Sequence, residues 1–236
     1  MIVFVKLLLA HLLGDFLLQP TFWVKDKEHK KHKSLFLYLH TFLHFILAWI
    51  LVGKQDFGLY ALALAVSHGI IDFLKVYFQT SQTKRNWFTA DQILHLVMIV
   101  VITLLYSKSS FEFSALGNHF WVIATAIIFL TKPTSIIIKN TISIWTPENK
   151  STDESLQNAG NYIGMLERLF VFSFIMTGHF EAIGFLLAAK SIFRFGDLKE
   201  AKDRKLTEYV LIGTLLSFGI ALLIGLLVQT GLQFSF

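Results

Sequence analysis

The chain has 236 residues, of which 54% are hydrophobic, only 16% are charged and none is cysteine. Soluble domains carry about 25% charged residues on average, so this composition, with a mean hydropathy of +0.59, indicates a membrane protein. The lack of cysteine excludes disulfide frameworks, cysteine-ligated metal sites and thiol catalysis, and the 3 Pro and 14 Gly exclude collagen-like and Pro/Gly-rich disordered chains.

Apolar stretches long enough to cross a membrane recur along the chain. A spanning helix needs about 20 mainly apolar residues, because each residue rises about 1.5 Å through a hydrocarbon core about 30 Å thick. The sequence predicts spans near residues 2–24, 35–53, 58–78, 90–107, 119–143, 160–177, 180–195 and 207–232. The two between 160 and 195 are short, and form either a tight helical hairpin or a pair of half-spans.

We therefore expect an all-α, polytopic transmembrane helix bundle of about seven or eight spans with no soluble domain. Residues 1–236 are predicted to form a single membrane domain. Its first half, residues 1–107, contains four helices, and its C-terminal half runs from 119 to 236.

Lys and Arg are concentrated in every second connection between these spans. Their residues are Lys25, Lys27, Lys30, Lys31, Lys33, Lys84, Arg85, Lys139, Lys150, Lys199, Lys202, Arg204 and Lys205, whereas the alternate connections hold only Lys54 and Lys108. By the positive-inside rule, the basic connections face the cytoplasm. The net charge of +5 then reflects contact with anionic lipid headgroups. Nucleic-acid binding is not expected, because the chain has no basic domain to follow a duplex.

Each of the first four predicted helices carries two ionisable residues spaced four apart. The pairs are His11 and Asp15 in HLLGD, His40 and His44 in HTFLH, His68 and Asp72 in HGIID, and Asp91 and His95 in DQILH. This spacing places both members on one helical face. The predicted orientation brings all four pairs to a similar depth, in or near the cytoplasmic half. Since ionisable side chains in hydrocarbon are costly, agreement in depth predicts a shared site.

Histidine and carboxylate side chains are ligands that zinc, non-haem iron and manganese favour. Eight candidates exceed the four ligands of one tetrahedral zinc, so either two metals bind or some of the eight orient the others. The excess of histidine favours zinc, with iron or manganese as alternatives, and the Glu-x-x-His repeat of ferritin-like di-iron bundles is absent. A proton or ion relay and a purely structural polar network remain open alternatives.

A second polar cluster is predicted in the C-terminal half. Its members are Glu167, Arg168, Lys190, Arg194 and Glu208. An unpaired buried charge is costly, so Glu167 is expected to pair with Lys190 or Arg194. The cluster either forms a cradle for an anionic headgroup or phosphate, or makes salt bridges between helices.

Lys132 stands beside Pro133 in the middle of the fifth predicted span. A proline within a span frees a backbone carbonyl. The sequence predicts that the lysine bonds this carbonyl or extends toward the site.

The motifs HLLGDFLLQ, HGIIDFLK, DQILH, IGMLERLF, AAKSIFRF and EYVLIGTLLS, in this order, resemble a bacterial family of polytopic membrane proteins catalogued as a domain of unknown function. The likeness extends over nearly the whole chain. The resemblance implies a bacterial inner-membrane location but no reaction. It supports as family positions His11, Asp15, His68, Asp72, Asp91, His95, Glu167, Arg168, Lys190, Arg194 and Glu208.

The leading functional hypothesis is a metal-dependent hydrolase that opens to the cytoplasmic leaflet. A zinc ion held by three histidines and a carboxylate would lower the pKa of a bound water toward about 7. One of Asp15, Asp72 and Asp91 would act as general base, and the basic cluster would neutralise an anionic or lipid-linked substrate. The alternatives are a proton or divalent-ion transporter or channel that uses the same His/Asp stripe, and a non-catalytic membrane scaffold or sensor.

Overall fold

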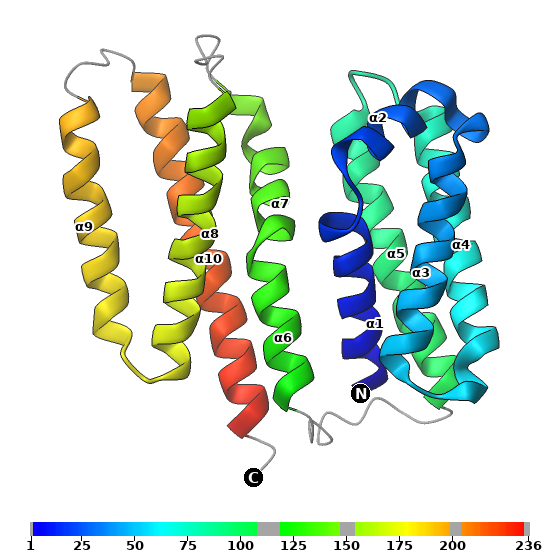
Figure 1. Cartoon of the computed structure of the whole chain (residues 1–236). Coiled ribbons are helices and arrows are strands. Elements are labelled where there is room, and N and C mark those ends of the chain that lie inside the picture. The colour runs from blue at the N-terminus through cyan, green and yellow to red at the C-terminus, as the bar shows by residue number, and fades with distance from the viewer. Residues whose placement is uncertain (1, 108–118, 147–153, 199–203, 234–236) are drawn as a thin grey trace. The chain divides into compact units, whose positions relative to one another are not determined.

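A computed structural model of the chain describes residues 2–107, 119–146, 154–198 and 204–233, and every element within these ranges is helical. The all-α prediction is therefore confirmed for the described residues. The chain divides into two compact units, Met1–Thr125 (unit 1) and Ala126–Phe234 (unit 2), which are described separately (Figure 1).

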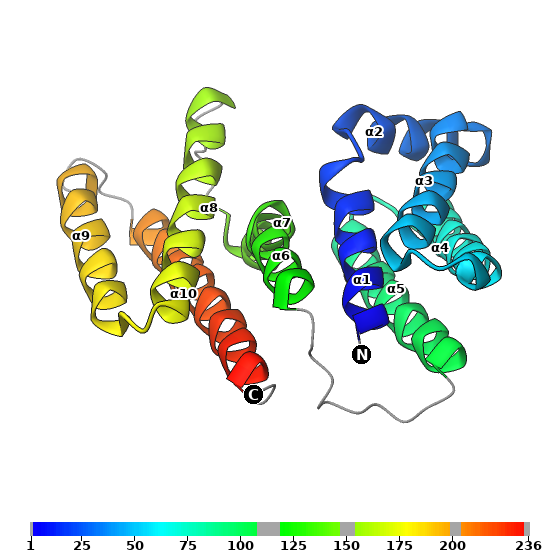
Figure 2. The ribbon, with the colours of Figure 1, turned by 60° about the horizontal axis from the view of Figure 1, so that its bottom comes forward.

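Unit 1 is a bundle of four helices with a short helix across one end. The elements are α1 (Ile2–Leu12), a π-helix (Leu13–Leu17), α2 (Thr21–Lys30), a 3-10 turn (Lys31–Lys33), α3 (Leu35–Val52), a 3-10 turn (Gln55–Phe57), α4 (Gly58–Phe78) and α5 (Lys84–Ser107). Helix α1 packs against α3 and α5, and α4 packs between α3 and α5. Helix α2 lies across the bundle end and contacts α3 and α4 (Figures 1 and 2).

The first predicted span, residues 2–24, ends earlier than predicted. After Leu12 the helix widens into one π-helical turn, in which the Leu18 amide donates to the Leu13 carbonyl at 2.8 Å. The chain then breaks before Pro20, which has no amide donor and disfavours helix at the residue before it. Residues 21–30 form α2, and the axis of the helical segment Thr21–Lys33 is bent 81° from that of Ile2–Leu17.

The interior of the bundle is divided between an apolar and a polar layer. Leu7, Phe57, Ala61 and Ile99 belong to a buried apolar cluster toward the end opposite α2. The polar layer, toward α2, contains buried histidines and carboxylates. Helices α3 and α4 approach closely because residue 69 is glycine, where a Cβ would lie 2.6 Å from the Thr41 hydroxyl.

The outer faces of these helices are apolar. Phe42 on α3, Ile70 on α4 and Val97 on α5 are 59%, 55% and 49% exposed. Apolar surface on this scale marks a protein or membrane contact. Among the described residues, four segments are long and apolar enough to cross a membrane, namely Leu35–Val52, Gln55–Phe78, Lys84–Ser107 and Thr207–Leu232, or up to six with the two bent helix pairs. This number is lower than the seven or eight spans that the sequence predicts.

The elements of unit 2 are α6 (His119–Leu130), which crosses the unit boundary, α7 (Lys132–Ile142), a 3-10 turn (Ser143–Trp145), α8 (Glu154–Met176), α9 (Phe180–Leu198) and α10 (Arg204–Gln233). Helix α10 packs along α8 and α7, and α9 packs against α8. The segment 160–195 is a helical hairpin, whose turn contains Gly178 with a φ of +78°. The fifth predicted span, 119–143, is two helices that meet at 40° near Pro133.

Candidate metal centre

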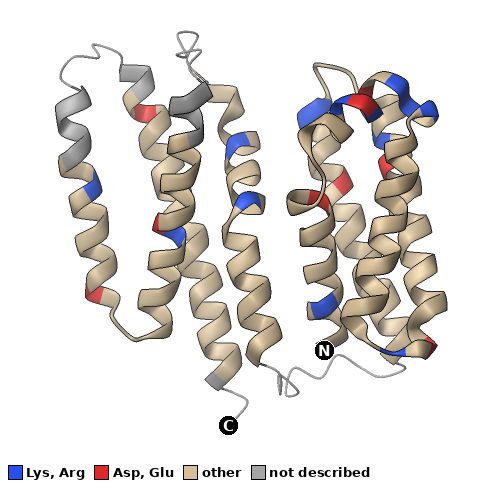
Figure 3. Cartoon of the chain, in the orientation of Figure 1, with Lys and Arg blue, Asp and Glu red and all other residues tan. Residues whose placement is uncertain are grey.

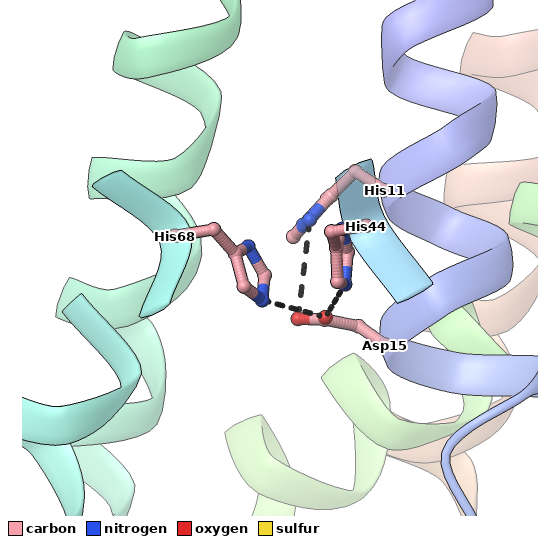
Figure 4. A group of neighbouring side chains, drawn as sticks. All are labelled: His11, Asp15, His44 and His68. Atoms are coloured by element: carbon pink, nitrogen blue, oxygen red, sulfur yellow. Dashed lines mark hydrogen bonds and ion pairs between the residues drawn. The ribbon is translucent and has the colours of Figure 1, made fainter. Parts of the chain in front are cut away.

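The polar layer of unit 1 brings together all eight ionisable residues of the four helix pairs. Asp15 lies at its middle, and its Oδ1 atom is 2.9 Å from the Nε2 atom of His44 and 3.1 Å from that of His40. The Nε2 atom of His68 is 3.4 Å from the same oxygen. Figure 4 shows His11, His44 and His68 converging on Asp15 from α1, α3 and α4. The imidazoles of His40, His44 and His68 therefore all approach the Oδ1 atom of Asp15.

The second oxygen of Asp15 faces a different set of groups. The Nδ1 atoms of His95 and His11 lie 3.8 Å and 3.9 Å from Oδ2. The Gln92 amide donates to Oδ2 at 3.2 Å, and its oxygen is 3.2 Å from the Nε2 atom of His11. Residue 15 thus links α1 to all three of the other long helices in unit 1.

The five imidazole rings also contact each other directly. His68 stacks on His44 and on His95, with ring centroids 3.7 Å and 3.9 Å apart. The Nε2 atoms of His40 and His68 are 3.1 Å apart, a separation at which one of the two nitrogens must present its lone pair. All five histidines are at most 6% exposed.

Several polar atoms of the cluster have no hydrogen-bond partner among the described residues. They are Nδ1 of His11, Nδ1 of His40, both ring nitrogens of His95 and Oδ1 of Asp91. Leaving a buried polar atom unpaired costs about 1–3 kcal/mol. A cation held by these nitrogen and oxygen atoms would remove part of that cost.

The side chains form three overlapping groups whose ligand atoms lie within 4.8 Å of one another. The groups are His11, Asp15, His44 and His68; His40, His68 and Asp72; and Asp15, Asp91 and His95. Bond lengths of about 2.0–2.1 Å around a tetrahedral zinc place its ligand atoms about 3.3 Å apart. The contacts of Asp15 Oδ1 fall near this separation, so small side-chain shifts would suffice to hold an ion.

Lys27 and Lys75 complete the cluster, and sequence reasoning missed both. Lys27 from α2 is only 4% exposed and its Nζ atom lies 2.6 Å from Asp72 Oδ2. The Nζ atom of Lys75 lies 2.7 Å from Asp91 Oδ2. The sequence contains a signal for Lys75, which follows His68 by seven residues on the same helical face. Lys27 has none, since it sits in a lysine-rich segment that resembles a solvated loop.

Asp15 differs from the other two buried carboxylates of the cluster in having no lysine partner among the described residues. Asp72 and Asp91 each have an ammonium partner, whereas the contacts of Asp15 among the described residues are with histidines and Gln92. Three carboxylates and two ammonium groups leave one net negative charge when the histidines are neutral. Asp15 is therefore the position in the cluster where a further cation is electrostatically most favoured.

Gly14 allows His44 to reach Asp15. A Cβ atom at residue 14 would lie 2.5 Å from both Cε1 and Nε2 of the His44 ring. Gly14 and Asp15 both belong to the π-helical turn, a distortion that is frequent at functional sites. In the motif HLLGD, Gly14 thus leaves room for the His44 ring, and Asp15 supplies the carboxylate that the ring contacts.

The second polar cluster lies in unit 2, where Arg168 bonds to the break between α6 and α7. Its Nε atom donates to the Leu130 carbonyl at 2.6 Å, and its Nη2 atom donates to the Thr131 carbonyl at 3.1 Å. Nη2 also donates to the Ser135 hydroxyl at 2.6 Å, and Nη1 donates to the Ser217 hydroxyl at 3.1 Å. Arg168 thus bonds the Leu130 and Thr131 carbonyls at the break, and the Phe129 carbonyl, four residues before Pro133, accepts from the Thr134 hydroxyl. Of the two roles predicted for Lys132, a bond to the freed carbonyl is not found among the described residues.

Of the other predicted members of this cluster, Glu167 and Lys190 form an ion pair. The predicted pairing of Glu167 with Lys190 is confirmed, with Oε2 and Nζ 2.5 Å apart. Glu208 is exposed near the start of α10. The side chain of Arg194 lies outside the described residues, as do the basic positions Lys108, Lys150, Lys199 and Lys202.

These features define an all-α protein with several helices apolar enough to cross a membrane, and a buried histidine and carboxylate cluster in one four-helix bundle. The chain belongs to the family described as "Protein of unknown function (DUF3307)", whose profile matches residues 3–123, about half of the chain. This confirms the resemblance to a family of unknown function. The match contains all eight residues of the cluster, whereas the motifs of unit 2 lie outside it. No curated protein and no solved structure matches the chain.

Proposed function

We propose that unit 1 is a membrane-embedded metal centre, with Asp15 as the central ligand. The observation that carries this proposal is the convergence of three imidazole Nε2 atoms on one carboxylate oxygen, within 3.4 Å, at a carboxylate without an ammonium partner among the described residues. A hydrogen-bonded network alone would leave the buried Nδ1 atom of His11, one of the histidines grouped with Asp15, His44 and His68, without a partner among the described residues.

Asp15, His44 and His68 are the proposed core ligands, with His11 or His40 completing the set. Three nitrogen atoms and one oxygen suit zinc, and also iron or manganese. Asp72 and Asp91 are held by lysines and are proposed to orient the histidines beside them.

We place this centre in a bacterial inner membrane crossed by seven or eight segments. Eight segments result when α1, the bent pair α6 and α7, α8 and α9 are counted with α3, α4, α5 and α10. Lys and Arg of unit 1 gather at the end where α2 lies (Figure 3), and by the positive-inside rule this end faces the cytoplasm. The metal centre then lies in the cytoplasmic half of the bundle.

The reaction we propose is hydrolysis of a lipid or lipid-linked substrate at the cytoplasmic leaflet. A bound zinc ion would supply an activated water at neutral pH. Asp91 is the best-placed general base, because its Oδ1 atom has no hydrogen-bond partner among the described residues. The substrate would enter at the α2 end, where the Lys75 side chain is 22% exposed.

Ion or proton transport is the second candidate, and the size of the cavity supports it. The space beside His11, His44, His68 and His95 is only about 10 Å³. A cavity of about 10–15 Å³ holds one water molecule, so a lipid substrate enters only if the helices of the bundle rearrange, whereas an ion or proton needs no such space. Flux through proteoliposomes separates the two candidates, since a hydrolase needs access from one side only.

Metal content, measured by mass spectrometry on protein purified without a histidine tag, tests the proposal. We expect one or two equivalents of zinc, iron or manganese in the wild type, and loss of metal in His44→Ala/His68→Ala. The matched control is His29→Ala/His32→Ala, which removes two exposed histidines and retains the metal. Wild-type protein that stays metal-free after loading with each of the three ions would refute the proposal.

A further inference from the structure

A second cavity lies within unit 2, at the end where α7 and α9 finish and α8 and α10 begin. Its volume is about 280 Å³, near the lower limit of the about 300–1,000 Å³ typical of small-molecule sites. Polar and charged side chains from all four helices line it, including Lys139, Asn161, Arg168, Lys190 and Ser217. The lining belongs to one unit and does not involve the histidine cluster.

The charge of this cavity is positive. Its described side chains include three cations, Lys139, Arg168 and Lys190, and one carboxylate, Glu167. Glu167 is already neutralised by Lys190. Lys139 is exposed and has no hydrogen bond or ion pair among the described residues. An anion that enters therefore meets Lys139 and Arg168 as uncompensated charges.

Arg168 retains one donor for such an anion. A guanidinium has five N–H groups, and four of those of Arg168 are used on Leu130, Thr131, Ser135 and Ser217. The fifth, on Nη1, has no partner among the described residues. The side chain is only 3% exposed, so this N–H group is held in a fixed direction by its four neighbours.

Glycines on α8 and α10 leave the space open. Gly160, Gly164 and Gly213 line the cavity. A Cβ at residue 164 would lie 3.4 Å from Nη1 of Arg168, so this glycine borders the unused donor. A Cβ at residue 160 would meet nothing within 4 Å, which shows that the cavity extends along α8.

We infer that this cavity binds an anionic, phosphate-bearing ligand of headgroup size, either the headgroup of an acidic phospholipid or a soluble phosphoester. Guanidinium and ammonium groups together recognise phosphate oxygens by charge-assisted hydrogen bonds. The site is independent of the proposed metal chemistry.

Binding to the full-length protein in detergent tests the inference with three probes. Glycerol phosphate is titrated by calorimetry, and delipidated protein is offered phosphatidylglycerol or phosphatidylcholine in native mass spectrometry. Saturable binding of glycerol phosphate would show that a soluble phosphoester is sufficient for binding in the cavity. Binding of phosphatidylglycerol alone identifies a lipid headgroup. Binding of neither, or equal retention of the zwitterionic lipid, overturns the inference.

Two glycine variants locate the binding. Gly160→Leu fills the cavity from α8 and is expected to weaken binding of the active probe at least about tenfold. Gly184→Leu is the matched control, because Gly184 lies on α9 outside the lining and its Cβ would also meet nothing within 4 Å. Unchanged binding in Gly160→Leu would contradict the assignment.

Lys139→Gln gives a second test if Gly160→Leu proves unstable. Loss of one charge–phosphate contact is expected to weaken binding by about threefold to tenfold. Equal affinity in Lys139→Gln and the wild type would remove the electrostatic basis of the site. Metal content in both variants should equal that of the wild type, so failure of this inference is distinguishable from failure of the metal centre.

Discussion

Asp15 differs from the other two buried carboxylates in its surroundings. Asp72 and Asp91 each accept from a lysine at 2.6 Å and 2.7 Å. Asp15 instead has imidazole nitrogens on both oxygens and one amide donor from Gln92. An ammonium group neutralises a carboxylate permanently, whereas imidazoles can share it with a metal ion. We therefore propose Asp15 as the carboxylate ligand of the metal.

Asp15→Asn tests this assignment at one atom. The amide keeps the size of the side chain but removes its charge, so we expect zinc affinity to fall by more than the about 10–100-fold typical of outer-shell partners. Competition with a chromophoric chelator measures the affinity. Asp56→Asn is the control, since Asp56 is exposed and, among the described residues, accepts from the Tyr106 hydroxyl alone. Equal affinities in Asp15→Asn and the wild type would contradict the assignment.

Gly14→Ala tests whether the backbone at residue 14 sets the position of His44. The added methyl would overlap the imidazole, so the ring must move away from Asp15. We expect a loss of stability of about 1–3 kcal/mol, as for overpacked cores, together with weaker metal binding. Gly58→Ala serves as control, because its Cβ would make an ordinary contact with Trp49 at 3.8 Å. Wild-type metal affinity in Gly14→Ala would show that His44 is not a ligand.

At the scale of elements, α2 closes the bundle end through buried and surface contacts. Lys27 reaches from α2 to Asp72 on α4. At the surface, Glu28 pairs with Lys84 at the start of α5 and accepts from Gln79. These contacts hold a helix that the Pro20 break has turned across the bundle.

Lys27→Met is expected to destabilise unit 1 by about 3–5 kcal/mol, because it leaves the Asp72 carboxylate buried and unpaired. Adding Asp72→Asn should recover most of this loss. Lys30→Met removes only an exposed pair with Asp26 and should cost less than about 1 kcal/mol. Thermal unfolding in detergent ranks the variants, and equal melting temperatures for Lys27→Met and Lys30→Met would contradict the buried contact.

Arg168→Lys tests whether the hydrogen bonds of Arg168 stabilise the break between α6 and α7 in unit 2. A lysine cannot reproduce four bonds to two carbonyls and two hydroxyls, so we expect a loss of about 1–3 kcal/mol at the α6–α7 break. The metal content of unit 1 should not change. An unchanged melting temperature would show that the break is stabilised by other contacts, such as the bond from Thr134 to the Phe129 carbonyl.

The sequence predicted two helices to within one residue, whereas α5 and α8 begin six residues before the predicted spans 90–107 and 160–177, because the first turns of both helices are polar. The prediction 58–78 matches α4, and 35–53 differs from α3 by one residue. Errors occurred at Pro20 and Pro133, where the direction of the chain after a break depends on tertiary contacts. The i, i+4 spacing identified eight cluster residues, because a shared helical face is a local property. Lys27 was missed because its burial depends on how α2 folds back over α4.

Across the whole of unit 1, histidines and carboxylates are buried in one layer of the interior while large apolar side chains cover the outer faces. His40 and Asp91 are each 1% exposed, whereas Leu59 on the outer face of α4 is 79% exposed. Water would favour the reverse distribution, so the arrangement suits a bilayer. The proposed orientation places the α2 end in the cytoplasm.

Single-cysteine labelling tests this orientation, because the chain contains no native cysteine. Lys31→Cys lies at the α2 end and Asp56→Cys near the opposite end of the bundle, and both positions are exposed. A membrane-impermeant maleimide added to intact cells should label residue 56 but not residue 31 until the cells are broken. The opposite pattern would invert the proposed orientation.

X-ray absorption at the metal edge tests the central claim most directly. We expect a metal bound in tag-free protein, with nitrogen and oxygen ligands at about 2.0–2.2 Å and the outer-shell scattering of several imidazole rings. The absence of an edge above background, or a ligand shell without imidazole, would contradict a metal centre built on Asp15 and its histidines.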